Sequence, residues 1–116
     1  MKIRITSVDF APDELYDQTP FDADLLREFP GPDRSDYWIG ALTNPIRWVR
    51  NGVETFVSYV VLASRYEGTR ISAGMKSFIV GIAYVVDESV LEDPALTFEK
   101  CEYVAIGSTD DISDAA

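Results

Sequence analysis

The pair Asn51-Gly52, placed between two β-like stretches, constrains the fold more than any other feature of this sequence. Both residues tolerate positive φ angles, which a two-residue type I′ turn requires, so the pair predicts a tight β-hairpin. Such a turn also determines which residues face one another across the two strands. The predicted cross-strand pairs are Arg50 with Val53, Trp48 with Thr55, and Ile46 with Val57.

Further strands are predicted on both sides of this hairpin. Residues 2–8 alternate polar and apolar side chains, and residues 37–42 form a short apolar run that we expect to end at Asn44-Pro45. In residues 77–87 large side chains alternate with small ones, a pattern typical of a strand that is buried on both faces. Residues 97–107 predict the last strand.

The segment 11–35 is rich in aspartate and proline and predicts an ordered loop for most of its length. Within it, residues 22–29 could form about two helical turns, with Asp22 as the N-cap, Pro30 as the stop and Leu26 on the buried side. The fold class predicted is mainly β, with α+β as the alternative. It has about six strands in a mostly antiparallel twisted sheet or a partly open barrel, and at most one short helix near 22–29.

Composition excludes several classes of chemistry. The 116 residues include no histidine and one cysteine, which rules out histidine-dependent nucleophile pairs, zinc sites of the usual ligand sets and an intramolecular disulfide. The longest apolar run, residues 78–86, is far shorter than the ~18 residues of a membrane span. We expect one cytoplasmic domain over 1–116, without cofactor or metal, whose acidic end at 108–116 frays.

The charge of the chain is strongly negative and unevenly distributed. Twenty acidic and ten basic residues give a formal net charge of -10. Residues 1–36 hold nine acids and four bases, residues 37–86 hold two and five, and residues 87–116 hold nine and one. Nucleic acids and anionic membranes repel such a protein, whereas a basic protein partner is attracted by it.

Two groups of residues are candidate contacts for such a partner. The first group consists of carboxylates in proline-punctuated segments, where recognition is more frequent than in scaffold strands: Asp13, Glu14, Asp17, Asp33 and Asp36. The second group combines aromatic rings with arginine, as interface hot spots do; from it we select Tyr37 and Arg47, beside Trp38, Trp48 and Arg50. The alternatives are a solvated acidic surface for the first group and a core tryptophan with flanking charges for the second.

Catalysis is not expected from this sequence. Acid/base work on glycosides needs two carboxylates facing each other across a cleft, and no spacing here selects such a pair. Cys101 has no base to activate it and is interpreted as a small core residue. The protein is therefore expected not to be an enzyme.

The profile as a whole is that of a small, acidic, histidine-free β-rich domain with a central DYWIGALTNPIRWV segment and a closing KCEYVAIG strand. It resembles, as a general type, the small bacterial toxin-immunity proteins. The resemblance implies a non-enzymatic inhibitor that binds a basic, nuclease-like toxin by mimicking the charge of nucleic acid. The alternative is a structural or small-ligand-binding β module that forms a homo-oligomer, joined by an edge strand or by the surface around Trp38 and Trp48.

Overall fold

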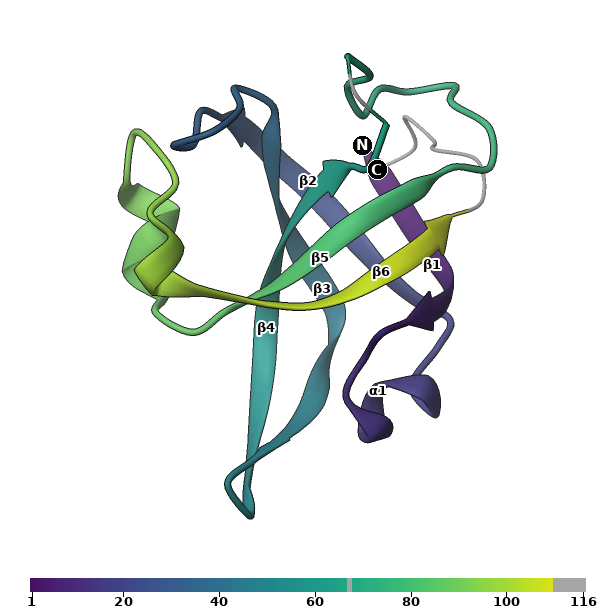
Figure 1. Ribbon diagram of the computed structural model, residues 1–116, viewed down its shortest axis with the longest axis vertical. Helices are drawn as coiled ribbons and strands as arrows, with labels where there is room; N and C mark the ends of the chain where they lie inside the picture. The colour runs from purple at the N-terminus through teal and green to yellow at the C-terminus, as the bar shows by residue number, and fades with distance from the viewer. Residues whose placement is uncertain (67, 110–116) are drawn as a thin grey trace.

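The computed structural model describes residues 1–66 and 68–109. Its six strands follow the chain order around a closed barrel, each antiparallel to the next, and the first strand pairs with the last (Figure 1). The strands are β1 Lys2–Asp9, β2 Phe21–Phe29, β3 Tyr37–Arg50, β4 Val53–Ser64, β5 Ile79–Val85 and β6 Cys101–Thr109. The helical turns are α1 Asp13–Tyr16, η1 Glu88–Glu92 and η2 Phe98–Lys100. The prediction of a mainly β, antiparallel fold is thus confirmed, with the barrel closed.

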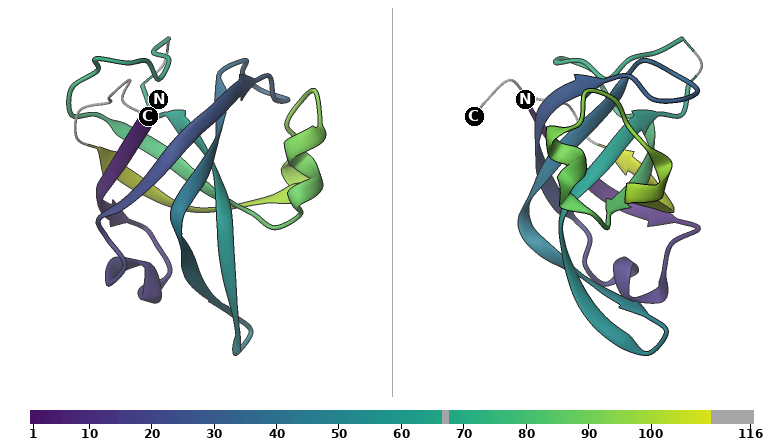
Figure 2. Two further views of the ribbon diagram at one scale, coloured as in Figure 1. Left: turned by 180° about the vertical axis from the view of Figure 1, so that it is seen from behind. Right: turned by 90° about the vertical axis from the view of Figure 1, so that its left-hand side faces the viewer.

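The predicted hairpin is confirmed in its register. Asn51 and Gly52 both have positive φ, 52° and 76°, and the three predicted cross-strand pairs are those of the structure. This hairpin is longer than the barrel is tall. The part of β3 and β4 that carries Ile46–Arg50 and Val53–Val57, which we call the arm, projects beyond the barrel wall (Figure 2).

Two local predictions are wrong. Residues 22–29 form a strand rather than a helix, because Ala23 and Leu25 point into the barrel while Asp24 and Leu26 point outward, with Leu26 55% exposed. Pairing with β1 on one side and β3 on the other stabilises this strand against its local helix signals. The one short α-helix, α1, occurs earlier in the segment that was expected to be loop.

The strand expected at 37–42 also does not end at Asn44-Pro45. It continues as β3 to Arg50, and the proline is accommodated where the register with β4 shifts between Ala41 and Ile46. At the other end of the chain, Ser108 and Thr109 belong to β6 rather than to a frayed tail. The rest of that predicted tail lies outside the described residues.

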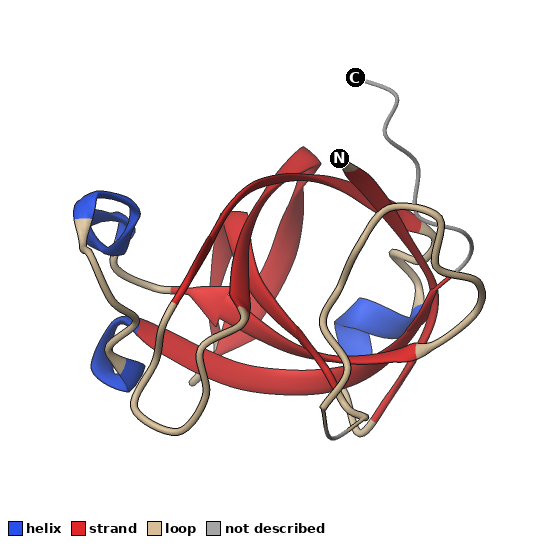
Figure 3. Ribbon diagram, turned by 90° about the horizontal axis from the view of Figure 1, so that it is seen from above, coloured by secondary structure: helices blue, strands red, loops and turns tan. Residues whose placement is uncertain are grey.

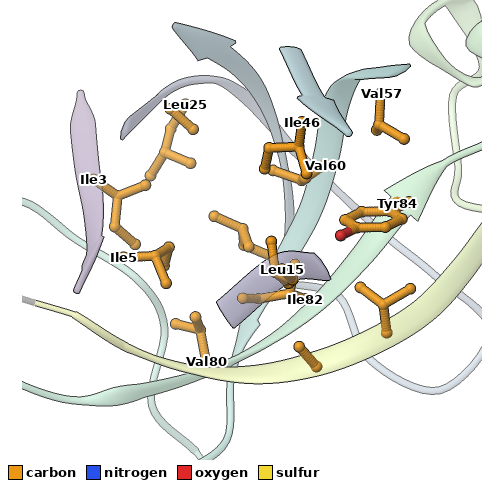
Figure 4. Packing of buried hydrophobic residues seen from close by; sticks show 14 of the residues in the cluster. Ile3, Ile5, Leu15, Leu25, Ile46, Val57, Val60, Val80, Ile82 and Tyr84 are labelled. Atoms are coloured by element: carbon orange, nitrogen blue, oxygen red, sulfur yellow. The ribbon is translucent and has the colours of Figure 1, made fainter. Parts of the chain in front are cut away.

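The barrel encloses the main core, and α1 closes one end of it. Side chains from all six strands fill the interior, among them the large residues of β5 that the sequence pattern assigned to the core, Val80, Ile82 and Tyr84 (Figure 4). Leu15 of α1 is fully buried among them, and the helix lies across the far opening of the ring of strands when the barrel is viewed from above (Figure 3). No helix among the described residues is long and apolar enough to cross a membrane.

A second apolar cluster lies on the outside of the barrel. The segment that carries η1 and η2 folds back over β2–β5 and buries Phe29, Ile39, Val61, Val85, Val90 and Leu96. Arg27 holds this segment in place, because its guanidinium donates hydrogen bonds to the carbonyl oxygens of Val90, Leu91 and Asp93. Both faces of the central part of β3 and β4 are therefore covered, unlike those of the arm.

Candidate functional site

The structure separates the seven predicted contact residues into two groups at opposite ends of β2. Asp13, Glu14 and Asp17 lie in or next to α1, beside the arm, where Arg47 also lies. Asp33, Asp36 and Tyr37 lie in or next to the β2–β3 loop at the other end of the barrel (Figure 1). The seven residues therefore do not form one continuous surface.

Side chains at the end of α1 are bonded to the backbone of the arm. The amide of Gln18 donates to the carbonyl oxygen of Arg47 and accepts from its N–H, both at 2.8 Å. The carboxylate of Glu14 accepts from the N–H of Val49 at 2.8 Å. Glu14 therefore has a structural role, whereas Asp13 and Asp17 are exposed and form no ion pair with any described residue. The guanidinium of Arg47 pairs with Glu54, at 3.6 Å, rather than with α1.

In the second group, Asp36 is a buried structural carboxylate. It is 7% exposed and accepts two hydrogen bonds from the guanidinium of Arg34, at 2.6 and 2.8 Å. These bonds hold the pKa of Asp36 below its ordinary value. Arg34 also donates to the carbonyl oxygen of Ser64 at 2.8 Å, so the pair ties the loop to the end of β4. Asp36 is therefore not available for a partner.

Asp33 and Tyr37 form a local hydrogen bond in which the phenol donates to the carboxylate. Burial of the ring, and next this hydrogen bond, raise the pKa of Tyr37. The phenol is thus neutral at physiological pH and serves to position Asp33, whose carboxylate stays exposed. Trp48, the alternative core residue of the aromatic group, is indeed buried and packs edge-on against Tyr84, with ring centroids 5.2 Å apart.

The carboxylates of the described residues fall into two classes. Those on the strands and the loops next to them are mostly ion-paired with a lysine or arginine: Asp22, Asp24, Glu28, Asp36, Glu54, Asp93 and Glu102. Apart from Asp33 in the β2–β3 loop, those without such a pair gather on the two excursions from the barrel: Asp9, Asp13, Glu14 and Asp17 around α1, and Asp87, Glu88, Glu92 and Glu99 around η1 and η2. We call these the α1 patch and the η patch.

The two patches lie on opposite sides of the β3–β4 hairpin, the α1 patch next to the arm and the η patch farther along, beside the barrel wall (Figures 1 and 2). Three apolar side chains of the arm are exposed: Val49, Val53 and Phe56. In the η patch, hydrogen bonding by the side chain of Ser89, and next by its backbone N–H, lowers the pKa of Asp87, which favours the ionised carboxylate. The sequence predicted the α1 carboxylates, but it could not show on which side of the β3–β4 hairpin the η carboxylates lie.

A cleft of about 360 Å³ opens on the outer wall of β4–β6. Its floor is made by small residues of neighbouring strands, Ala63, Gly81 and Ala83, and its walls by the rings of Tyr37, Phe98 and Tyr103. Arg65 lies at this cleft and forms no ion pair with any described carboxylate. The sequence analysis missed the cleft as a site, although the small odd positions of 77–87 signalled a close approach there.

Cys101 also lines the cleft, and burial raises the pKa of its thiol to about 11. The thiol is therefore protonated at neutral pH and a poor nucleophile. Within residues 1–66 and 68–109, no three carboxylate or thiol side chains gather in a way that could hold a metal ion.

Comparison of the chain with protein-family models, with curated proteins and with solved structures gave no match. The function must therefore be argued from the arrangement of charge, apolar surface and hollows described above.

Proposed function

We propose that this chain is a non-enzymatic, cytoplasmic binding protein of the bacterial toxin-immunity kind, which neutralises a basic, nuclease-like partner. The observation that carries the proposal is the separation of charge in the fold. Among the described residues, carboxylates on the barrel are mostly matched by bases, whereas the unmatched ones, apart from Asp33, are gathered on the α1 patch and the η patch, on opposite sides of the β3–β4 hairpin.

The physical consequence is an attraction that acts in two stages. At long range, a net charge of -10 speeds the encounter with a basic protein and orients it toward the patches. At short range, Asp13, Asp17, Glu88 and Glu92 are exposed and can accept charge-assisted hydrogen bonds from lysine and arginine. The exposed apolar residues of the arm provide a surface from which a bound partner can displace water.

The test uses a basic protein encoded beside this gene, with association rates measured at low and high salt. The double variant Asp13→Asn/Asp17→Asn and the double variant Glu88→Gln/Glu92→Gln are each expected to slow association at low salt by about tenfold. The matched control is Asp22→Asn/Asp24→Asn, which removes the same formal charge from residues that are already ion-paired with Arg4 and Lys2. Equal effects of all three variants would show that only net charge matters and that the patches have no specific role.

A second candidate function is the binding of a small ligand in the outer cleft. The observation that favours it is the combination of aromatic walls, a floor of small residues and an arginine without an ionic partner among residues 1–66 and 68–109, which suits a flat aromatic anion. An anionic naphthalene dye is a suitable probe: Arg65→Gln and Tyr103→Ala should each weaken its binding at least about tenfold. Binding of the dye that neither variant changes would exclude this cleft.

A further inference from the structure

The two edges of the arm differ in the hydrogen bonds that their outward backbone groups make with the rest of the chain. On the β3 edge, the backbone groups of Arg47 and Val49 that point away from β4 are bonded to the side chains of Gln18 and Glu14. On the β4 edge, no hydrogen bond from any described residue reaches the corresponding groups of Glu54 and Phe56.

The register between β3 and β4 shows which backbone N–H and C=O groups of the arm do not bond across the hairpin. In a hairpin with a two-residue turn, the residues that flank the turn, here Arg50 and Val53, exchange both of their hydrogen bonds. Along the arm, Thr55 and Val57 then also bond to β3. The N–H and C=O groups of Glu54 and Phe56 must point outward, toward the space where another strand would lie.

No described residue occupies the position beside Glu54 and Phe56, because β5 turns away before reaching it. Within the barrel, β5 pairs with β4 from Val60 to Ser64. Beyond that point the N–H groups of Val86 and Asp87 both donate to the carbonyl oxygen of Lys100, so the chain turns away toward η1 (Figure 1). The position beside Glu54 and Phe56 is thus a direct continuation of the path of β5, and it begins where the η patch starts.

This edge lacks most of the usual protections against strand addition, and Glu54 is its one charged residue. Residues 53–57 contain no proline and no lysine, and their register with β3 is regular. Phe56 is 64% exposed and Val53 60% exposed, so the edge also offers apolar contacts on both faces of the arm.

We propose that an extended segment of the basic partner binds here as an added strand, pairing with β4 through the backbone of Glu54 and Phe56. The inference rests on the proposed function, and it assigns the docking site within it. The segment should alternate apolar residues, which pack on Phe56 or Val53, with lysine or arginine, which competes with Arg47 for the carboxylate of Glu54 and extends toward the η patch. A net charge of -10 opposes a second copy of this chain as the occupant.

The direct test is backbone amide exchange in the presence of a synthetic peptide in which seven residues alternate lysine and valine. Without the peptide, the amides of Glu54 and Phe56 should exchange much faster than those of Thr55 and Val57. With it, the exchange of Glu54 and Phe56 should slow at least about tenfold, while Thr55 and Val57 stay unchanged. A peptide with glutamate in place of lysine is the control and should give no protection.

Two variants at one position separate backbone pairing from packing of the ring. Phe56→Pro removes an outward N–H that β3 does not use, whereas Phe56→Ala keeps the N–H and removes the ring. Peptide affinity should fall by at least about tenfold in Phe56→Pro and by less than about threefold in Phe56→Ala. Protected amides of Thr55 and Val57 in the free variants would show that the arm is intact. Equal affinity for both variants would overturn the proposal.

The outcomes also distinguish this inference from the proposed function. If neutralising the patches slows association with the basic protein but Phe56→Pro leaves its affinity unchanged, the docking site is wrong and the function stands. If only Phe56→Pro acts, the charge argument fails. Protection of Glu54 and Phe56 that depends on protein concentration, without any peptide, would identify a second copy as the occupant and overturn the assignment to a basic segment.

Discussion

Strands β3 and β4 pass through two different environments, the barrel wall and the arm. In the wall, Ile39 and Val61 are covered by the outer cluster, while Val60 and Leu62 face the barrel core. In the arm, one face packs through Trp48 and Val57 and the other is open to solvent at Val49 and Phe56. The same pair of strands is thus stabilised from both faces in the wall and from one face in the arm. We therefore expect the wall to supply most of the stability of this hairpin, and we propose the arm for recognition.

The largest expected difference in stability between the two regions comes from a substitution that creates a cavity in the wall. Ile82 of β5 is fully buried in the barrel, so Ile82→Ala should lower the free energy of unfolding by about 3–4 kcal/mol. Val53→Ala, at the exposed tip of the arm, should change it by less than about 0.5 kcal/mol. Urea denaturation followed by tryptophan fluorescence measures both. Similar losses in the two variants would contradict the division between wall and arm.

A smaller effect is expected at the ion pair that ties the β2–β3 loop to the wall. Asp36→Asn removes the charge of the carboxylate and replaces one of its two acceptor oxygens with an NH2 group that faces the partly buried guanidinium, and it should cost about 2 kcal/mol at neutral pH. The effect should extend to the outer cleft, because Arg34 and Tyr37 both line it.

The pH dependence of this variant has a definite sign. The folded-state pKa of Asp36 lies below its ordinary value of 3.8, so the ionised pair stabilises the fold fully above that value. The stabilisation is lost as the pH falls through the lowered pKa. The difference in unfolding free energy between wild type and Asp36→Asn should therefore be constant near neutrality and shrink in acid. A difference that grows on acidification would contradict the assigned pair.

Gln18→Ala should have a smaller and more local effect. It removes two hydrogen bonds on the β3 edge of the arm and should cost about 1 kcal/mol, because water can reach the freed groups. Exchange of the Arg47 amide should speed up while that of the Ile82 amide should not. Uniform acceleration would mean that the arm and the wall unfold as one unit, which would contradict the division between them.

The parts of this architecture that follow from local chemistry were predictable. Asn51 and Gly52 specify the hairpin and its register because the turn imposes its geometry on the residues beside it. Alternation likewise predicted the inward side chains of β5. Strand β2 was missed because Asp22 and Pro30 imitate a helix cap and stop, while its pairing with β1 and β3 depends on how the α1 segment and the β2–β3 loop fold.

The candidate site was predictable only in part, for the same reason. Asp13 and Asp17 were selected from the sequence and are exposed without an ionic partner in the described part of the chain, but Asp36 is paired with Arg34, two residues away. No local signal distinguishes these cases, because pairing depends on how the loop packs on Ser64. The open edge at Phe56 could not be predicted from the sequence either, because it depends on β5 turning away toward Lys100.

The smallest expected effect concerns two neighbouring residues of the arm. Phe56 lies on its open face, so Phe56→Thr, which keeps a strand-forming residue, should change the free energy of unfolding by less than about 0.5 kcal/mol. Val57 is buried against the barrel core, and the control Val57→Ala should cost about 2 kcal/mol. A large aromatic residue whose removal costs the fold nothing is explained by a role outside the fold. If Phe56→Thr proves as destabilising as Val57→Ala, the ring stabilises the arm itself. Its exposure would then no longer support a surface for a partner on the open face.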